Sequence, residues 1–585
     1  MLHIIRNAAK VQRRRQEGIN SYSDYLFDIL AYLGVSYTTW DHTAWIEEKP
    51  AGTSIVIGGT DHALWVSACR DYVQSGNSLL TVGDSYGLHE LFGIRLTGRI
   101  SEGWIQWGDA PIAEGLRSSF HFFGARTFTC ADDELQQYGT LISRNGQPSS
   151  TPGLGIRKLG NGTAALLNFD VMKTFCLIQQ GLPVTVDGLP APDGSGAIDE
   201  GILKTDDGSV LDWERDRDAV EEVPFYLHPI VDEMRCLLNR LLVRLEHEAG
   251  SRIVQKWFWP DGLDAIGHIS HDTDGNDGAE AEMMLDWLRR ANVKSTWCII
   301  MPGYEQVVND RIEGEGHEVA LHYNALETEI AESSWSEEHF QFQLEMLQAQ
   351  FPNTHIVSNK NHYLRWEGDV QFYHWCERAG IKVEQSKGGT KRGNKGFLAG
   401  TCHPYVPLSH AGAHNRRLDV LSLPTLAWDP PDEMRCSERE AYALLERSRE
   451  VYGVAHFLLH PGAMGAMPGD RGGELLVKLV ELGRSLGMAW WTSEEIGRWC
   501  VTRNHVRIDV RKDSTERRVV SIASDDRLQG FTLLLTVQPH EALIIKESQS
   551  CTIRSTKRLR RFGCEYTEVI LDAEQGTSEF CFLGR

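Results

Sequence analysis

The sequence predicts an α/β protein in which a (β/α) barrel is preceded by a doubly wound parallel domain and followed by a small β-sandwich. With 585 residues the chain is too long for one domain, since domains average about 150 residues. Apolar runs of strand length alternate with helix-like segments over residues 1–190 and again over 250–504. Residues 505–585 instead show short alternating runs and polar turns, which are typical of antiparallel sheets.

The first domain is predicted over residues 1–190. Its strand–helix–strand order favours a parallel sheet covered by helices. In chain order the sequence predicts a strand at 53–59, a helix at 62–76, a strand at 77–83, a turn and helix at 84–93, and a late strand or hairpin at 160–170.

Residues 191–249 are predicted to be a linker followed by a helix. Gly, Pro and Asp are frequent from 181 to 222, and apolar residues recur at helical spacing over 225–250. The barrel follows over 250–504, complete or incomplete. Its predicted strands lie at 265–272, 294–301, 316–322, 381–386, 454–460 and 487–492.

The last domain, residues 505–585, carries no catalytic cluster and is predicted to bind glycan or to serve as a packing module. Its basic run at 555–563 is expected to form a solvated face. The predicted strands lie at 505–513, 517–526, 530–538, 542–548 and 566–572.

Composition narrows the range of partners. The net charge of −22 argues against nucleic acid or an anionic membrane, because both select basic surfaces. No apolar run is long enough to span a membrane, and the basic N-terminal stretch lacks the apolar core of a signal peptide. Twelve cysteines without a CxxC pair indicate free thiols in a reducing compartment, so a cytoplasmic location is expected. The sequence gives no signal for the oligomeric state.

Two elements of the barrel end in metal-binding or acid–base side chains. Asp272 and Asp274 close the strand at 265–272, where side chains two apart can face one site. His322 closes the strand at 316–322. A DxDG turn or a lone histidine is more often structural, but carboxylates and imidazole together suit zinc or a similar ion.

Two later elements add candidates. His460 closes the strand at 454–460, where an imidazole is well placed as a general acid or base. Arg365 lies among aromatic residues in NKNHYLRWEG, three residues after His362. The arginine either partners a carboxylate of the site or stacks on a surface loop.

In this order the elements resemble the NodB-type polysaccharide deacetylases. HISHDTDG is similar to the aspartate-pair motif of the family, GHEVALH to its metal-histidine motif, LRWEG to its arginine motif and FLLHPG to its last histidine motif. The resemblance covers about residues 250–503. It implies a metal-dependent hydrolase that removes an acetyl group from an N-acetylated carbohydrate.

The resemblance also implies roles for single residues. Asp272 would be the base and His460 the general acid, and Arg365 would hold the base ionised. Asp274 and His322 would bind a divalent metal, most consistent with Zn²⁺. Trp366 and Trp428 are candidate sugar platforms at the barrel mouth.

Two departures from the family pattern concern the metal. The second imidazole, expected four residues after His322, is replaced by Leu326, and Thr273 separates the two aspartates. The third ligand is therefore expected from elsewhere, with His362 as first choice and Asn324 as second. The alternatives are a non-catalytic glycan-binding protein on a degenerate deacetylase fold, and an amidase acting on a non-sugar amide.

The first domain resembles class I glutamine-amidotransferase domains, which are flavodoxin-like. The nucleophile turn of that family corresponds to Gly83-Asp84-Ser85-Tyr86-Gly87, which lacks a cysteine, so glutaminase chemistry is not expected. The turn does spell G-x-S-x-G, which occurs in serine-hydrolase elbows between a strand and a helix. A scaffold or sugar-binding role is the other interpretation of this domain.

Overall fold

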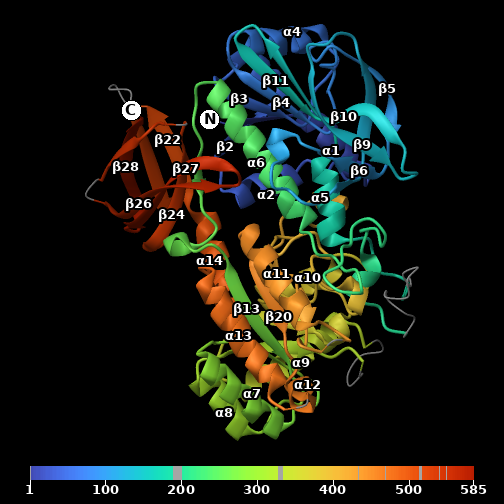
Figure 1. The fold of residues 1–585 in the computed structure, drawn as a ribbon, viewed down its shortest axis with the longest axis vertical. Helices are drawn as coiled ribbons and strands as arrows, with labels where there is room; N and C mark the ends of the chain where they lie inside the picture. The colour runs from blue at the N-terminus through green and yellow to red at the C-terminus, as the bar shows by residue number, and fades with distance from the viewer. Residues whose placement is uncertain are drawn as a thin grey trace. The chain divides into compact units, whose positions relative to one another are not determined.

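The computed structural model describes residues 2–188, 201–326, 334–432, 434–467, 469–512, 517–538, 540–547 and 550–584. The chain divides into two compact units (Figure 1). Unit 1 comprises Met1–Cys176, Glu233–Gly262 and Thr502–Arg585, and unit 2 comprises Leu177–Asp232 and Leu263–Val501. Unit 1 thus groups the first and last predicted domains. The finer division at residues 190, 249 and 504 stays a prediction.

The first sheet of unit 1 is parallel in one half and antiparallel in the other. The order is β2-β1-β3-β4-β11-β10-β9-β6-β7, and pairing is parallel from β2 to β11 and antiparallel beyond. The strands are β1 (Leu2–Arg6), β2 (Tyr37–Asp41), β3 (Thr53–Val56), β4 (Ser78–Val82), β6 (Gly103–Gln106), β7 (Phe120–Phe122), β9 (Gln136–Ser143), β10 (Pro148–Leu159) and β11 (Gly162–Leu167). A separate hairpin pairs β5 (Ile94–Ile100) with β8 (Ala125–Cys130).

The helix predicted over 84–93 is wrong, and turns occupy the segment. Gly83, Tyr86, Gly87 and Gly93 have positive φ angles, which a right-handed helix does not admit. The helices of this part are α1 (Ala8–Gln16), α2 (Tyr25–Leu33), α3 (His42–Glu48), α4 (Ala63–Gln74) and α5 (Val171–Gln180), followed by α6 (Ile230–Glu248). The structure contains the predicted helices at 62–76 and 225–250, as α4 and α6. The likeness to glutamine amidotransferases stays a prediction.

The C-terminal residues, together with β12 from residues 254–256, form two four-stranded antiparallel sheets; the separate sandwich domain stays a prediction. One has the order β12-β24-β27-β26 and the other β22-β23-β28-β25. The strands are β12 (Val254–Lys256), β22 (Arg507–Lys512), β23 (Arg518–Ser524), β24 (Leu528–Thr536), β25 (Leu543–Lys546), β26 (Cys551–Arg561), β27 (Cys564–Ala573) and β28 (Gly576–Gly584). The basic run lies mostly in β26, where most of its side chains are exposed.

Unit 2 is built on a parallel sheet of the order β18-β17-β16-β15-β14-β13-β20-β19, with β21 paired to β13. Because the order ends at β18 and β19, the barrel is open. The strands are β13 (Ile266–Asp272), β14 (Thr296–Ile299), β15 (Glu318–Tyr323), β16 (Ser358–Asn361), β17 (Val383–Glu384), β18 (Leu421–Ser422), β19 (Ala427–Trp428), β20 (Val454–Leu458) and β21 (Ala489–Trp490). All six predicted barrel strands are present.

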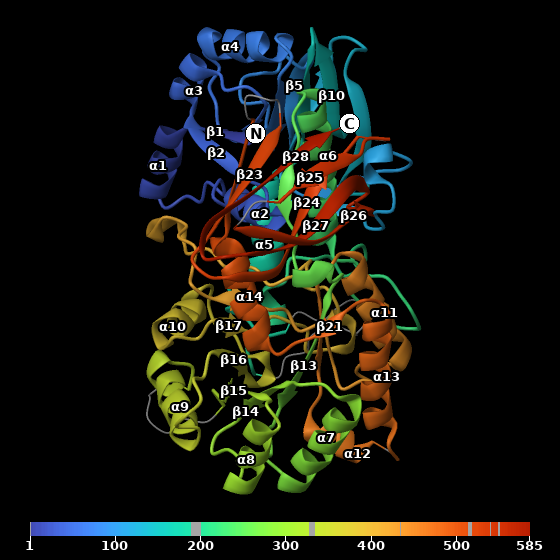
Figure 2. The ribbon, with the colours of Figure 1, turned by 90° about the vertical axis from the view of Figure 1, so that its left-hand side faces the viewer.

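Helices surround this sheet, as Figure 2 shows. They are α7 (Gly278–Ala291), α8 (Gln306–Gly314), α9 (Glu337–Gln350), α10 (Gln371–Ala379), α11 (Glu438–Glu450), α12 (Pro461–Ala466), α13 (Arg471–Ser485) and α14 (Ser493–His505). In α7 the apolar residues Ala281, Leu285 and Leu288 recur at helical spacing, and all three are buried in the core. This packing fixes the strand ends that carry the functional side chains.

Strand β16 escaped prediction because all four of its residues are polar. They are nevertheless completely buried, since each side chain finds a partner. Ser358 donates a hydrogen bond to Glu318, and Asn361 donates to the carbonyl of Arg365. Hydropathy therefore gives no sign of a strand that the barrel interior stabilises by hydrogen bonds.

The segment expected as a linker contributes to unit 2 wherever it is described. Residues 189–200 lie outside the described residues. Beyond them, the Thr205 hydroxyl lies 2.9 Å from the carbonyl oxygens of Ser386 and Gly388. Asp206 accepts hydrogen bonds from the backbone and side chain of Thr390. These contacts hold the segment against the loop that follows β17.

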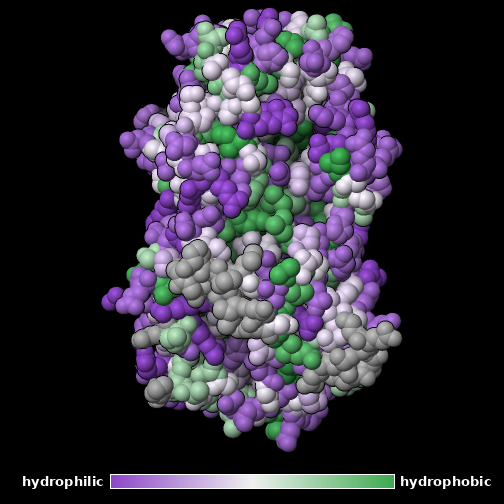
Figure 3. Space-filling model, turned by 90° about the vertical axis from the view of Figure 1, so that its right-hand side faces the viewer, coloured by the Kyte–Doolittle hydropathy of each residue, from purple (hydrophilic) through white to green (hydrophobic). Residues whose placement is uncertain are grey.

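The surface and the cysteines agree with the composition. Hydrophilic side chains cover most of the face seen in Figure 3. All twelve cysteines are free. Among the helices that the structure describes, none has the length and hydrophobicity needed to cross a membrane.

Candidate functional site

The carboxyl ends of the barrel strands open into a cleft of about 630 Å³. Parallel strands present their carboxyl ends at one edge, where barrels place their functional loops. The predicted residues that line the cleft are Asp272, Asp274, His322, His362, Trp428 and His460. They come from the ends of β13, β15, β16, β19 and β20 or from the residues directly after them.

Asp274, His322 and His362 bring three ligand atoms together within 4.8 Å of one another. His322 Nε2 lies 3.3 Å from Asp274 Oδ1, and His362 Nε2 lies 3.7 Å from the same oxygen. Asp274 follows β13 with a φ of 28°, a turn conformation that places its carboxylate beside the two imidazoles. His362, the first choice for the third ligand, thus comes from the end of the next strand, β16.

Each imidazole is oriented by a second hydrogen bond. His322 Nδ1 lies 2.9 Å from the Lys360 carbonyl, so Nδ1 carries the hydrogen and donates it. His362 Nδ1 likewise donates to Asn324 Oδ1 at 3.2 Å. Both Nε2 atoms are therefore left with a free lone pair. Asn324, the second choice for a ligand, orients His362 instead.

The electrostatics favour a deprotonated ligand set. Burial opposes the charge of Asp274, but the close contact with His322, together with the nearby His460 and His362, outweighs it and holds the pKa of the carboxyl well below its usual range. Burial, with the charge of His322, lowers the pKa of His362 to about 4. At neutral pH this imidazole is uncharged and can ligate.

The ligand set fits a divalent metal. His322 Nε2 is completely buried and has no hydrogen-bond partner in the described structure. A buried ring nitrogen without a partner is costly unless a ligand satisfies it. One carboxylate and two imidazoles correspond to the three protein ligands that catalytic zinc sites use, with a further position left open.

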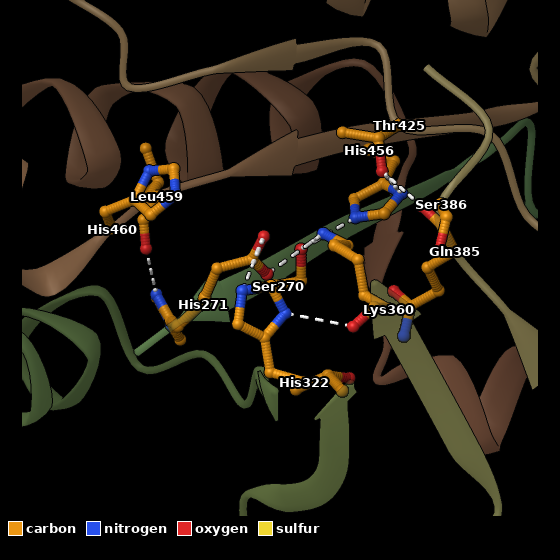
Figure 4. A network of polar contacts seen from close by, with 12 residues as sticks. Ser270, His271, His322, Lys360, Gln385, Ser386, Thr425, His456, Leu459 and His460 are labelled. Carbon is orange, nitrogen blue, oxygen red and sulfur yellow. Dashed lines mark hydrogen bonds and ion pairs between the residues drawn. The ribbon is translucent and has the colours of Figure 1, made fainter. Parts of the chain in front are cut away.

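Asp272 lies beside this triad and faces Lys360. The Nζ atom of Lys360 is 3.6 Å from Asp272 Oδ1, and both side chains are buried. Lys360 also donates a 2.5 Å hydrogen bond to Ser270, which is 2.8 Å from His456 Nε2 (Figure 4). The base candidate therefore has a buried cation behind it, held by a polar network inside the barrel.

The role expected of Arg365 is wrong. Its guanidinium donates to Glu367, at 3.0 Å from Nε, and to the carbonyl of Ala325. Because the guanidinium of Arg365 is bound by the Glu367 carboxylate, two residues away, Arg365 does not reach Asp272. Lys360, five residues earlier and on β16, supplies the positive charge. Its only signal in the sequence is the polar run that precedes His362.

His460 is paired with Asp429, a residue that the sequence did not single out. The His460 Nδ1 atom lies 2.8 Å from Asp429 Oδ2, and the His460 backbone N–H donates to Asp429 Oδ1 at 2.7 Å. Burial opposes the charged form of His460, but the charge and hydrogen bond of Asp429 outweigh it and raise the pKa to about 9. The imidazole is therefore protonated at neutral pH, as a general acid requires.

The two tryptophans have different positions. Trp366 is only 1% exposed and packs in the core of unit 2, with its indole N–H bound to the carbonyl of Asp369, so the sugar-platform role is wrong. Trp428 is partly exposed and lines the cleft. Tyr363, which is 49% exposed and also lines the cleft, is an aromatic surface that sequence reasoning missed.

The turn at Ser85 in unit 1 does not form a nucleophile elbow. Ser85 is 2% exposed, and turns follow it in place of the helix that an elbow requires. Asp84 is bound to Arg126 by a 2.9 Å hydrogen bond. The G-x-S-x-G motif therefore does not adopt the geometry of a serine-hydrolase elbow here.

No protein-family model and no curated protein match this chain. Among solved structures, a candidate polysaccharide deacetylase from Mycobacterium smegmatis is similar at 15% identity and a TM-score of 0.32, over 42% of this chain and 92% of that one. Peptidoglycan deacetylase PdaC from Bacillus subtilis is similar at 12% identity and a TM-score of 0.24, over 42% and 95%. A β-galactosidase from Rahnella sp. R3 is similar at 11% identity and a TM-score of 0.24, over 29% and 28%. Similarity this low leaves the function to be argued from the site.

Proposed function

We propose that unit 2 is a metal-dependent hydrolase that removes the acetyl group from an N-acetylated carbohydrate. The observation that carries this proposal is the grouping of Asp274, His322 and His362 beside a buried carboxylate and a protonated histidine. Amide hydrolysis needs an activated water, a base for its proton and an acid for the departing nitrogen. The cleft holds a candidate for each task.

Asp274, His322 and His362 would hold the ion, with zinc as the best match to the ligand types. A bound divalent ion supplies Lewis acidity, which lowers the pKa of water and polarises a carbonyl. Lys360 and Asn324 fix the two imidazoles through their Nδ1 atoms. That arrangement keeps both Nε2 lone pairs directed into the cleft.

Asp272 and His460 would move the protons. Asp272 accepts a proton from the attacking water as its oxygen bonds to the acetyl carbon, and Lys360 stabilises the carboxylate for this task. His460 Nε2 gives its proton to the nitrogen as the C–N bond breaks, and Asp429 compensates the charge of the imidazolium beforehand. The products are acetate and a free amine.

The carbohydrate part of the proposal has separate support. Trp428 and the exposed ring of Tyr363 line the cleft, and aromatic faces commonly stack on sugar rings.

The test is acetate release from N-acetylglucosamine oligomers by the Zn²⁺-loaded protein. Asp272→Asn and His460→Asn should each lower the rate by about 10²-fold or more, since each removes one acid–base group. Ser85→Ala, in unit 1, is the control and should retain full activity. Release from simple acetamides but not from sugars would indicate an amidase. Glycan binding with no acetate release would instead indicate a non-catalytic protein.

A further inference from the structure

Unit 1 contains a second cleft, of about 710 Å³, that the proposed deacetylation does not use. It lies at the carboxyl ends of parallel strands. Asn7 follows β1, Gly58 lies two residues beyond β3, and Asp84 lies two residues beyond β4; all three line it. Its volume falls in the range of about 300–1,000 Å³ that small-molecule sites occupy.

The cleft coincides with the point where the strand order reverses. From β1 the chain passes to β2 on one side and then to β3 on the other, since β1 pairs with both. Open α/β sheets bind ligands in the crevice at such a point. At Gly58 a β-carbon would lie 2.7 Å from the Asn7 nitrogen, so no side chain can fill the space between the two strand ends.

The lining of this cleft is positive, although the chain has a net charge of −22. Its charged residues are Lys10, Arg14, Arg99, Arg126 and Lys173, against Asp84 and Asp170. The five cations exceed the two carboxylates by three, and the charge of Asp170 acts on Lys173 and Arg14. Asp84 binds Arg126, and Asp170 accepts a 3.0 Å hydrogen bond from the backbone N–H of Lys173 at the start of α5.

Several cations therefore stay available to a ligand. Within the described residues Lys10, Arg14, Arg99 and Lys173 form no ion pair with a carboxylate. Arg14 donates one hydrogen bond, to the Asn20 carbonyl, and its Nε is buried without a hydrogen-bond partner. Helix α1 begins at Ala8, directly after β1, so its N-terminal dipole adds positive potential beside Asn7.

We propose that this cleft binds a phosphorylated small molecule, of the size of a sugar phosphate or nucleotide. Three or more uncompensated cations match a group with more than one negative charge better than a single carboxylate. Lys10 and Arg14 line the cleft from α1 and Lys173 from α5. The volume left over is large enough for a sugar or nucleoside.

Isothermal titration of the full chain tests the proposal with UDP and glucose 1-phosphate, against uridine and glucose as uncharged counterparts. At least one phosphorylated probe should bind at least about tenfold more tightly than its counterpart, the factor that one charge-assisted hydrogen bond supplies. Preference for UDP or for glucose 1-phosphate then identifies the rest of the ligand. Binding of neither, or equal binding of charged and uncharged probes, overturns the proposal.

Variants locate the binding. Lys10→Gln and Lys173→Gln should each weaken the bound probe about tenfold. Arg13→Gln, an exposed residue of α1 outside the cleft, is the matched control and should bind as the parent does. Circular dichroism checks that each variant is folded. Equal affinity in all three variants, or an equal loss in Arg13→Gln, would show that the cleft is not the site.

Discussion

At the scale of residues, the two acid–base groups of unit 2 differ because their buried partners differ. His460 faces Asp429, which favours its protonated form, whereas Asp272 lies 3.6 Å from the Nζ atom of Lys360. One group is thereby prepared to give a proton and the other to take one. The sequence pattern singled out neither partner, although Lys360 lies in the same NKNHYLRWEG segment as His362.

The pairing of His460 with Asp429 predicts a pH effect. Activity that needs the protonated imidazole is present below a pKa of about 9 and falls as pH rises through that value. Asp429→Asn removes the charge that raises this pKa, so the alkaline limb of kcat should move toward lower pH. Asp419→Asn, which alters an exposed carboxylate outside the cleft, should leave the limb in place. An unchanged limb in Asp429→Asn would contradict the assignment of His460 as the acid.

The pairing of Asp272 with Lys360 predicts a contrast between two substitutions. Lys360→Met should lower kcat by about 10²-fold, because the base loses the cation that positions it. Arg365→Gln should lower kcat much less, since Arg365 contacts Glu367 and the Ala325 carbonyl. Zinc content and KM measured beside kcat separate positioning of the base from loss of the metal. A larger loss in Arg365→Gln than in Lys360→Met would restore the arginine to the role that the sequence suggested.

At the scale of elements, the three candidate metal ligands come from the ends of β13, β15 and β16, and β14 lies between β13 and β15 in the sheet. The loop after β15 carries Asn324, and the turn after β16 carries His362, so one hydrogen bond links the two loops. Held by this hydrogen bond, the imidazole of His362 takes the place of the one expected at position 326. Strand β16, which directly precedes His362, is stabilised by buried polar contacts.

The loop contact predicts a loss of metal affinity. Asn324→Ala leaves all three ligands in place but removes the acceptor that orients His362. Substitution of such a supporting group costs about 10–100-fold in affinity. Competition with a zinc-binding dye measures the change, and Asn353→Ala, an exposed asparagine, is the control. Equal zinc affinity in Asn324→Ala and the parent would exclude His362 as a ligand in this orientation.

At the scale of the whole molecule, two compact units each contain their own hydrophobic cluster. One cluster includes Trp65 and Phe92 of unit 1, and another includes Trp297 and Phe340 of unit 2. The candidate metal ligands all lie in unit 2, and the second cleft lies in unit 1. Ligands should therefore stabilise the units selectively.

Calorimetry checks this selectivity. We expect two unfolding transitions, of which Zn²⁺ raises one. At a free concentration 100 times its Kd, a ligand stabilises the unit it binds by about 2.7 kcal/mol. In His322→Ala the shift should disappear while the other transition stays where it was. A Zn²⁺ shift that persists in His322→Ala would place the metal elsewhere.

Much of the fold could be predicted from the sequence, because the spacing of apolar residues indicates which positions are buried. The apolar runs at β13, β14, β15 and β20 stand out from polar surroundings, and each became a barrel strand. Periodicity failed at β16, where the buried side chains are polar, and at 84–93, where positive φ angles prevent a helix. Both failures arise from interactions or backbone angles that hydropathy does not register.

The sequence by itself determined six of the barrel strands, β13, β14, β15, β17, β20 and β21, because apolar runs of strand length can be recognised along the chain, and it also showed the Asp and His residues at the ends of three of them. Only the tertiary structure decided which of these side chains meet. It placed Lys360 behind Asp272, Asp429 beside His460 and His362 beside His322. It also drew Arg365 to Glu367 and buried Trp366. Side chains that meet in a barrel lie on different strands. Their distance along the chain therefore does not predict which of them are in contact.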